Sequence, residues 1–399
     1  MIRLLTFVLA LSGALGAGLP AAEAGATSRP DPKQAAQQKA ADKVFDLSRL
    51  HVIDIVISEE GVRHLTEMSD TRYRCTVTFD GLELKDVGVR QAGGMFHPYQ
   101  PITGKPSLSL KFNEFVKGQR LHGLEKLVLK NQAQDQSLLN EHLTYEMFRR
   151  AGVPAALTAY AVVRLNGRPA GIYLMREPVD DDFMLRNFGE ANTGGNLYEL
   201  EFHAGDFVRN PWGVDLKDEA KEKRNRADLV ALATATAGTP DAAFVPNLAK
   251  HLDLDRTATY FAVETLTGHW DGISFRNNNT YLYHLAGADR FVIIPHGADQ
   301  SFGGRGGRGG GFRGGSFGGF PPELLAQRFR TVPELAAKYE AELARAGGAP
   351  VWDQAALLAR VEQIAKLLAS YDRPNEIAFD LARFTSNRPW VESFIRNGQ

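Results

Sequence analysis

Residues 269–303 read HWDGISFRNNNTYLYHLAGADRFVIIPHGADQSFG, and this stretch determines how the rest of the chain is interpreted. Two of its segments, residues 280–283 and 290–295, are rich in aromatic and β-branched residues, which is typical of β-strands. The short polar segment between them predicts a turn, so we expect a hairpin. Asp271 precedes the first strand and Asp299 follows the second. Both carboxylates are therefore expected at the same end of the hairpin.

Side-chain oxygens gathered at that end would make a site for a hard metal ion. The asparagine triplet 277–279 directly precedes the first strand, and such oxygens suit Mg²⁺ or Mn²⁺ bridging phosphates, with one Asp left free as a base. A catalytic Asp, a later Asn, a hairpin and a metal-binding Asp is the order found in protein kinases. The spacing departs from the usual kinase motif, because Arg276 lies five residues beyond Asp271. A structural interpretation stays open, in which Asp271 caps a turn and Asp299 caps a helix.

Length and composition describe a folded protein with balanced charge. The chain has 399 residues, of which 44% are hydrophobic, enough for one large domain or two medium ones with a buried core. The formal net charge of -1 provides no overall field that would attract nucleic acid or a membrane. Cys75 is the only cysteine, so no disulfide can form within the chain, and the strand-like pattern around it predicts a buried thiol.

The N-terminal segment has the pattern of an export signal. Arg3 is followed by an apolar run, residues 4–19, and the Ala-Glu-Ala of residues 22–24 is typical of a cleavage site. We therefore expect residues 1–24 to be a secretory signal peptide, and the protein to be secreted, periplasmic or on the cell surface. No other stretch is apolar enough to predict a membrane span after cleavage. Residues 25–45, rich in Ala, Gln, Lys and Pro, are expected to be a mobile leader.

Hydrophobic patterning divides the remaining chain into two lobes. Residues 46–178 contain repeated alternation of apolar and polar residues, which predicts a β-rich lobe. Two helices are expected within it, a short one over residues 59–67 and one that Asp135 or Ser137 caps and that runs to about residue 151. After Glu177 and Pro178 the pattern becomes mainly helical, apart from the hairpin described above. The expected fold class is α+β, with a β-rich N-lobe and a mainly helical C-lobe over residues 179–399.

A glycine- and arginine-rich tract, residues 303–320, follows the hairpin. Such tracts occur in proteins that bind single-stranded nucleic acid. Three arginines in an exported protein are weak support for that role, so nucleic acid is not the expected partner. We expect a disordered loop beside the site that Asp271 and Asp299 define.

Six segments in matching order resemble the CotH kinase family, named for a spore coat protein H. They are DVGVRQAGG (86–94), KPSLSLKFNEF (105–115), LVLKNQAQDQSLLNEHLTYEMFRRAGVPA (127–155), RLNGRPAGIYLMREPVD (164–180), HWDGISFRNNNTYLYH (269–284) and FVIIPHGADQSFG (291–303). The likeness covers the chain from about residue 50 to the C-terminus. It implies a secreted or surface protein with an atypical, two-lobed protein-kinase-like fold. It also implies ATP-dependent phosphorylation of Ser or Thr in an exported or surface protein, or in the chain itself, with Mg²⁺ or Mn²⁺.

The resemblance implies roles for four residues of the hairpin region. Asp271 is similar to the catalytic Asp, which would accept the proton of the substrate hydroxyl. Asp299 is similar to the metal-binding Asp. Asn278 or Asn279 would complete the metal shell, and Asn279 is the one set directly before the strand.

The resemblance also implies a nucleotide-binding group in the N-lobe. Lys105 fits the family's basic position best and would neutralise the α- and β-phosphates of ATP, with Lys111 as the alternative. Glu141 would be the helix partner of that lysine, although an acidic residue in the first turn of a helix is also favoured by the helix dipole alone. Glu177 lies where the chain passes between the lobes, close to the expected position of the adenine.

Two departures from the family pattern leave a second function open. Many members carry two acidic residues before the glycine, whereas residues 296–299 read His-Gly-Ala-Asp and keep only Asp299. The glycine- and arginine-rich tract also falls where an activation segment would lie. The alternative to a kinase is therefore a weak or inactive pseudokinase that acts as a surface or coat assembly protein.

Overall fold

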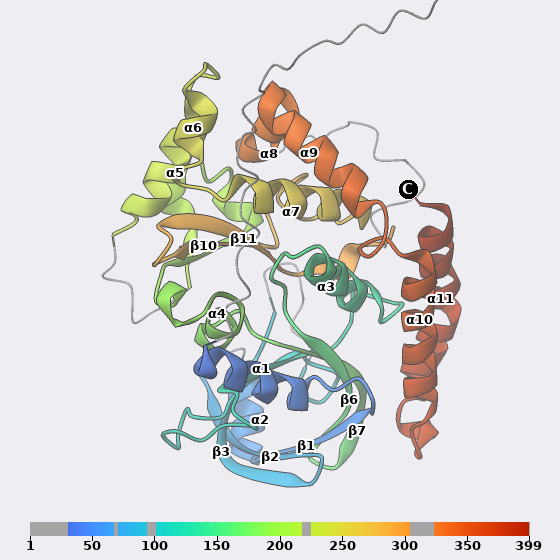
Figure 1. Ribbon diagram of the computed structural model, residues 1–399. Coiled ribbons are helices and arrows are strands. Elements are labelled where there is room, and N and C mark those ends of the chain that lie inside the picture. Colours follow the sequence, from blue (N-terminus) through green and yellow to red (C-terminus); the bar gives the residue numbers. More distant parts are fainter. Residues whose placement is uncertain (1–30, 68–70, 94–100, 218–224, 304–322, 399) are drawn as a thin grey trace, which may run out of the picture.

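The computed structural model describes residues 31–67, 71–93, 101–217, 225–303 and 323–398, which form two lobes (Figure 1). The first lobe is a β-barrel with helices on its outside, and the second combines a small sheet with most of the helices. The expected α+β class is confirmed. The predicted signal peptide and the glycine- and arginine-rich tract beyond Gly303 lie outside the described residues.

Seven strands close the barrel in the order β1-β2-β3-β4-β5-β7-β6. Their pairing is antiparallel except between β1 and β6, which run parallel and close the cylinder. Alternate residues of each strand point inward, as Ile53 and Ile55 of β1 and Val77 of β2 do, and together they form a dry core. The strands are β1 (His51–Ile57), β2 (Tyr73–Phe79), β3 (Leu82–Gln91), β4 (Leu108–Lys111), β5 (Lys126–Lys130), β6 (Thr158–Leu165) and β7 (Arg168–Arg176).

The expected mobile leader is corrected in part, because its second half is helix α1 (Pro32–Val44). The side chain of Asp31 accepts a hydrogen bond from the backbone N of Lys33 at 3.0 Å and caps the helix. Ala41 and Val44 are fully buried and belong to the barrel core. Ala41 and Val44 are spaced as on one face of a helix. The surrounding Ala, Gln and Lys residues give only a weak hydrophobic pattern, so the sequence did not predict this helix.

The prediction that Cys75 is a buried thiol is confirmed. The residue is a buried free thiol on β2 and faces the barrel core. Burial raises its pKa to about 12, with a small opposing effect from the positive charge of Arg72. The thiolate is therefore disfavoured at neutral pH, and the residue acts as a small hydrophobic side chain.

The second lobe is built around a four-stranded sheet of order β11-β10-β8-β9. Its strands are β8 (Leu197–Leu200), β9 (Asp215–Leu216), β10 (Thr280–Leu285) and β11 (Arg290–Pro295). The helices around it share one large hydrophobic core. They are α5 (Ala227–Ala237), α6 (Phe244–Leu248), α7 (Leu254–Leu266), α8 (Leu324–Thr331), α9 (Pro333–Ala346), α10 (Gln354–Ala369) and α11 (Ala378–Asn397).

Helix α3 (Asn140–Arg150) joins the two lobes, although it follows the barrel strand β5 in sequence. Leu143 and Met147 pack into the core of the second lobe together with residues of α7 and α10. Figure 1 shows α3 between the barrel and the helices above it, with α10 and α11 running alongside both lobes. Residues of α3 therefore lie where the two lobes meet.

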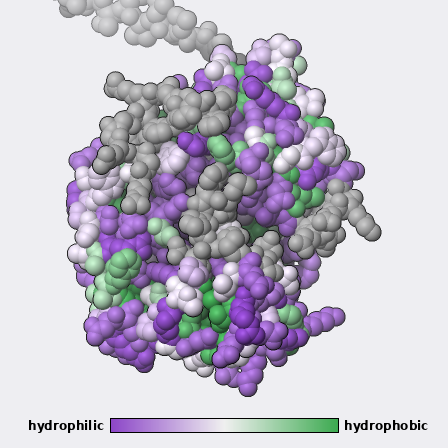
Figure 2. Space-filling view, turned by 180° about the vertical axis from the view of Figure 1, so that it is seen from behind, coloured by the Kyte–Doolittle hydropathy of each residue, from purple (hydrophilic) through white to green (hydrophobic). Residues whose placement is uncertain are grey.

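The remaining helices lie outside the barrel. Helix α2 (Glu59–Thr66) follows β1, and helix α4 (Asp181–Phe188) begins shortly after β7 ends at Arg176, so the lobe boundary expected at residue 178 falls between them. Among the described residues, no helix combines the length and apolar character that a membrane span requires. Figure 2 shows mostly hydrophilic residues on the described part of one face, with apolar residues in small separate groups.

Candidate active site between the two lobes

The β10–β11 hairpin brings Asp271 and Asp299 to one edge, as the sequence predicts. Thr280 at the start of β10 pairs with Pro295 at the end of β11. Just beyond this pair, the backbone N of His296 donates to the carbonyl of Asn279 at 3.0 Å. The loop that carries Asp271 therefore meets the turn that carries Asp299.

Helix α7 delivers the Asp271 loop. The side chain of Asp253 caps the helix by accepting from the backbone N of Arg256 at 3.0 Å. Beyond its last turn, His269 is fully buried, with Nδ1 3.5 Å from Oε1 of Glu264 on the same helix. Burial lowers the pKa of His269, but Glu264 and the nearby carboxylates outweigh burial and raise it overall. The positive charge that this favours lies two residues from Asp271.

Asp271 is largely buried, and its carboxylate is held by a neighbouring amide. Oδ2 of Asp271 accepts a hydrogen bond from Nδ2 of Asn279 at 2.9 Å. Burial raises the pKa of Asp271, while the charges of His269 and Arg276 and hydrogen bonds from Asn278 and Asn279 oppose the shift. The result is a fixed carboxylate with a proton affinity above that of a solvated Asp, which is suited to a general base.

A glycine makes the approach of Asn279 to the Asp299 turn possible. Asn279 has φ of 48°, in the left-handed region that Asn tolerates better than most residues. Gly297 also has positive φ, and a Cβ built on it would lie 2.3 Å from Oδ1 of Asn279. The amide oxygen of Asn279 therefore faces the backbone turn two residues before Asp299, and only glycine leaves room for it.

Asp299 lies in a short 3-10 turn, η5 (Ala298–Gln300), against helix α3. Nδ2 of Asn140 on that helix donates to the backbone oxygen of Asp299 at 3.0 Å. Burial raises the pKa of Asp299 to about 7, and the negative charges of Glu141 and Asp271 act in the same direction. The positive charge of Lys130 opposes this shift but does not cancel it. The site thus holds more negative than positive charge.

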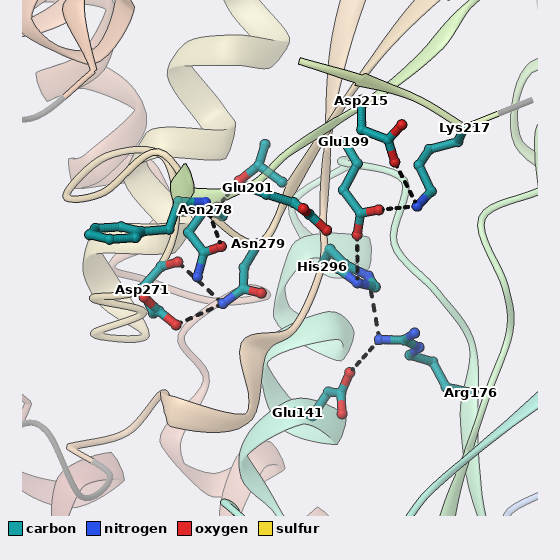
Figure 3. Close-up of polar contacts among 12 residues, drawn as sticks. Glu141, Arg176, Glu199, Glu201, Asp215, Lys217, Asp271, Asn278, Asn279 and His296 are labelled. Carbon is teal, nitrogen blue, oxygen red and sulfur yellow. Dashed lines mark hydrogen bonds and ion pairs between the residues drawn. The ribbon is translucent and has the colours of Figure 1, made fainter. Parts of the chain in front are cut away.

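A chain of polar contacts extends from α3 to the outer strand of the second sheet (Figure 3). Nη1 of Arg176 lies 3.2 Å from Oε1 of Glu141 and 3.4 Å from Nδ1 of His296. Nε2 of His296 lies 3.4 Å from Glu199, whose other oxygen pairs with Lys217 at 2.5 Å. Burial, followed by the charges of Arg176 and other cations, lowers the pKa of His296 well below its usual range. His296 is therefore a neutral link between two charged groups.

Sequence reasoning missed Lys130, the lysine that acts on the carboxylates of the site. Burial alone would raise the pKa of Glu141, but the charge of Lys130, followed by that of Arg176, lowers it overall. The same lysine acts on Asp299 and His296. Lys130 is the last residue of β5, directly before the loop that leads to α3. Its place at the end of a strand before the Glu141 helix was the available signal.

Lys105 and Lys111, the two lysines expected to bind the phosphates of ATP, contact other residues. Nζ of Lys105 is 2.6 Å from Oδ1 of Asp380 on α11, and Nζ of Lys111 is 2.8 Å from Glu114. The expected pairing of Lys105 with Glu141 is corrected, because Arg176 is the partner of Glu141. Lys105 precedes β4, and Lys111 is the last residue of β4, where it pairs with Lys126 at the start of β5 and not with Lys130 at its end.

Glu177 and Asn278 make structural contacts. The carboxylate of Glu177 accepts from Arg186 at 2.8 and 2.6 Å and from the backbone N of Leu157 at 3.0 Å, which ties the end of β7 to α4. The oxygen of Asn278 accepts from the backbone N of Phe202 at 3.3 Å, so it is engaged with the loop after β8. Asn279 is therefore the better placed of the two predicted amide ligands.

The chemistry of these groups fits a hard divalent cation. Within the described ranges no three His, Cys, Asp or Glu residues converge as a metal cluster. The available donors are instead the carboxylate of Asp299 and the amide oxygen of Asn279, which faces the same turn. Carboxylate and amide oxygens are ligands that Mg²⁺ and Mn²⁺ prefer, often with waters and phosphate oxygens completing the shell. Burial, followed by the negative charges of nearby carboxylates, raises the pKa of Asp299, so a bound cation would stabilise its charged form.

Comparisons with known proteins agree with these features. The model of the CotH kinase protein family matches residues 98–373, more than half of the chain. Inner spore coat protein H of Bacillus subtilis (strain 168) is 24% identical over 201 residues, which is 47% of this chain and 53% of that protein. An inner spore coat protein H-like protein of the same organism is 34% identical over 70 residues, 18% of this chain and 21% of that protein. The chain thus matches about half the length of the first relative.

The solved structures with similarity to this chain include a bacterial kinase. The proinflammatory kinase CtkA of Helicobacter pylori aligns over 75% of this chain and 96% of its own, with 11% identity and a TM-score of 0.26. Identity and TM-score are both low, so the assignment rests on the family match. Because that match includes the loop of Asp271 and the turn of Asp299, the chain belongs to the CotH kinase protein family.

Proposed function

We propose that this protein transfers the γ-phosphate of ATP to a Ser or Thr hydroxyl of a protein substrate, possible substrates including the chain itself. One observation supports this most strongly. Asp271, half-buried, and Asp299, buried, lie at one edge of a hairpin, and the charges of Lys130 and Glu141 act on Asp299 from the β5–α3 region. Membership of the CotH kinase protein family supports the same reaction.

In this proposal Asp271 acts on the acceptor. Its carboxylate would orient the acceptor hydroxyl and accept its proton as the new oxygen–phosphorus bond forms and the bond to the β-phosphate oxygen breaks. The hydrogen bond from Asn279 fixes the direction of the carboxylate. The raised pKa of Asp271 brings its proton affinity closer to the working pH, which favours general-base catalysis.

The residues on the other side of Asp271 would hold the nucleotide. Lys130 would neutralise phosphate oxygens, and Glu141, held by Arg176, would keep that lysine in place. Asp299 and Asn279 would be the protein ligands of Mg²⁺ or Mn²⁺. When bound, the cation would offset negative charge on the transferring phosphates.

Export and substrate class belong to the same proposal. The N-terminal sequence supports secretion, and two curated relatives are named as inner spore coat proteins. A surface or coat protein is therefore the substrate we propose. The absence of a membrane-spanning helix among the described residues is compatible with that location.

A second candidate is a non-catalytic member that binds partners in a surface or coat assembly. The contact that favours it is the pairing of Glu141 with Arg176, because an arginine there occupies the carboxylate that would position a lysine. The single acidic residue in the 296–299 segment points in the same direction. Both candidates allow nucleotide binding, and only the first requires phosphate transfer.

The decisive experiment compares Asp271→Asn with a matched control. The control is Asp289→Asn, which removes the same charge from an exposed position at the opposite end of the hairpin. Purified protein is incubated with labelled ATP and Mg²⁺ or Mn²⁺, and incorporation into the chain and into added serine-rich proteins is measured. Asp271→Asn should lower transfer by at least ~100-fold and keep the nucleotide-induced rise in Tm, because binding to the folded state stabilises it.

Each other outcome has a defined meaning. If the wild type transfers no phosphate over a range of metal and pH, the non-catalytic candidate is correct. If Asp271→Asn matches an active wild type, Asp271 is a turn residue and the base lies elsewhere. If Asp289→Asn loses activity to the same extent, the effect reflects the hairpin and not the chemistry of Asp271.

A further inference from the structure

Arg276 is a cation beside Asp271 that the described protein leaves without an acidic partner. Its guanidinium carbon lies 4.9 Å from the ring centroid of Trp270 and 5.9 Å from that of Phe202. Its Nε is buried and has no hydrogen-bond partner among the described residues. In the same part of the chain, no carboxylate oxygen lies within 4.0 Å of its side-chain nitrogens.

Three other arginines of the interior have hydrogen-bonding or acidic partners. Arg176 and Arg186 pair with Glu141 and Glu177. Arg330, which lies over the ring of Phe275 near the same loop, donates to the backbone oxygen of Ser274 at 3.0 Å. The buried Nε–H of Arg276 has no acceptor among the described residues, and an unsatisfied buried donor is unfavourable. Arg276 therefore resembles a group prepared for a ligand more than a structural ion pair.

The position of Arg276 places that ligand on the acceptor side of the site. Arg276 acts on the pKa of Asp271, after burial and His269. The charges that act most strongly on Asp299 come instead from Lys130, Glu141, Asp135 and Asp271. Lys130 and Asp299 mark the place proposed for the nucleotide. Arg276 and Trp270 belong to the loop of Asp271, and Phe202 follows β8, so a group that contacts Arg276 would lie beside Asp271, where the hydroxyl to be phosphorylated must lie.

The two rings also restrict the guanidinium. Aromatic faces on Trp270 and Phe202 attract a cation and limit its rotation, while the edge of the guanidinium stays available for hydrogen bonds. A flat fork of N–H donors matches the two oxygens of a carboxylate or a phosphate. The backbone N of Arg276 donates to the oxygen of Gly272 at 2.7 Å, which fixes the residue to the loop of Asp271.

We propose that Arg276 binds an anionic group of the acceptor protein, next to the hydroxyl that Asp271 activates. The group is the carboxylate of an Asp or Glu, or the phosphate of a residue phosphorylated in an earlier round. The substrate class is therefore an acidic or progressively phosphorylated segment. This recognition presupposes the phosphoryl transfer proposed above, and the experiment is arranged so that the two can fail separately.

The kinetic test uses the full chain and three synthetic acceptor peptides. The peptides share one sequence around a central serine and differ only in the flanking residue, which is Asp, phosphoserine or Asn. For the wild type, kcat/KM should be at least ~10-fold higher with an anionic flank than with Asn, mainly through KM, which reflects charge-assisted hydrogen bonds. In Arg276→Gln this ratio should fall to near 1. Arg276→Lys, which keeps the charge but not the flat fork, should give an intermediate ratio.

A charge-matched control separates local recognition from overall charge. Arg209→Gln removes one positive charge from an exposed side chain and should leave the ratio unchanged. Thermal unfolding of each variant shows whether it is folded. Equal kcat/KM for all three peptides in the wild type, or an equal loss for all three in Arg276→Gln, would overturn the assignment. Comparison of the Asp and phosphoserine peptides tells which anion is recognised.

A binding measurement covers the case in which no peptide is phosphorylated. Fluorescence anisotropy of the same peptides, labelled with fluorescein, is followed on addition of wild type, Arg276→Gln or Arg209→Gln. Tighter binding of the anionic peptides that disappears only in Arg276→Gln supports the recognition even if transfer fails. If wild type binds the Asn peptide as tightly as the anionic peptides, the recognition is wrong, whether or not phosphate is transferred.

Discussion

Lys105 and Lys130 lie at two different boundaries of the barrel, and their surroundings differ in charge balance. Lys105 meets Asp380 of α11 at 2.6 Å, and that carboxylate also accepts from the backbone N of Ile172 at 2.7 Å and from Arg383 at 3.3 Å. Lys130 instead acts on several carboxylates, of which Asp299 keeps a pKa raised to about 7. In the first place, two cations share one carboxylate. In the second, negative charge is in excess.

This difference separates a structural contact from a site that awaits a ligand. A matched buried pair holds two elements together and gains nothing from a further ion. An excess of carboxylates costs stability in the free protein and is relieved by a cation or by a ligand that brings one. The position of a lysine near the end of a strand does not tell a structural contact from a ligand site. The charged residues around the lysine do.

The largest expected effect is on activity, through Lys130. Lys130→Met should lower phosphate transfer by about 10²–10³-fold, because a positioned charge that offsets charge in the transition state is lost. Lys105→Met should leave transfer per folded molecule unchanged. Both rates are measured with labelled ATP at a temperature where each variant is fully folded. Equal losses in the two variants would show that the comparison of charge balance does not identify the nucleotide site.

The second effect is on stability, through Lys105. Lys105→Met should lower the free energy of unfolding by about 2–3 kcal/mol, because the buried Asp380 loses its closest counter-charge. Denaturant unfolding measures this loss. The double variant Lys105→Met with Asp380→Asn should recover part of it, since the uncompensated carboxylate is then removed. A loss below about 0.5 kcal/mol would mean that Arg383 and Ile172 suffice to hold Asp380.

The third effect tests whether an unmatched carboxylate by itself indicates function. Asp180 caps α4, and its nearest cation is Lys126, with Nζ 3.8 Å from Oδ2. Burial raises the pKa of Asp180 to about 7, whereas an unfolded chain has the ordinary low value. The folded state therefore holds a proton that the unfolded state has lost, and stability falls as pH rises from about 4 to about 7.

Asp180→Asn keeps a capping oxygen and removes this cost. The variant should be more stable than the wild type at pH 8, by about 4 kcal/mol, and the difference should vanish near pH 4. Transfer activity should not change. Thermal unfolding across this pH range measures the first effect. A difference that does not vary with pH would show that Asp180 ionises normally in the folded chain.

Features formed within one stretch of sequence were predictable, and features formed by contacts between distant segments were not. The hairpin, Asp271 and Asp299 were predictable because strand patterns and flanking residues lie within one continuous stretch. For Lys130 the sequence offered only its place at a strand end before the Glu141 helix, because its relation to Glu141 and Asp299 depends on the closure of the barrel and the placement of α3. The family resemblance directed attention to Lys105, whose partner Asp380 is 275 residues away in sequence. Contacts of that kind leave no local pattern.

Helix α1 and Arg276 were missed for different reasons. Helix α1 buries the small residue Ala41 beside Val44, so its inner face is barely apolar by sequence. Arg276 was noted only as a departure from the kinase motif. Its significance appears once the rings of Trp270 and Phe202, which are far apart in sequence, are seen to contact the same guanidinium.

The closed barrel also bears on where the chain can be cut. The family match begins at residue 98, after β1, β2 and β3, and ends at residue 373, before α11. A fragment with these limits would open the cylinder along β4 and β6 and remove the carboxylate that neutralises Lys105. Unpaired strand edges promote association between molecules. The segment that matches the family is thus shorter than the folding unit. A fragment that keeps both the closed barrel and α11 must run at least from His51 to Asn397.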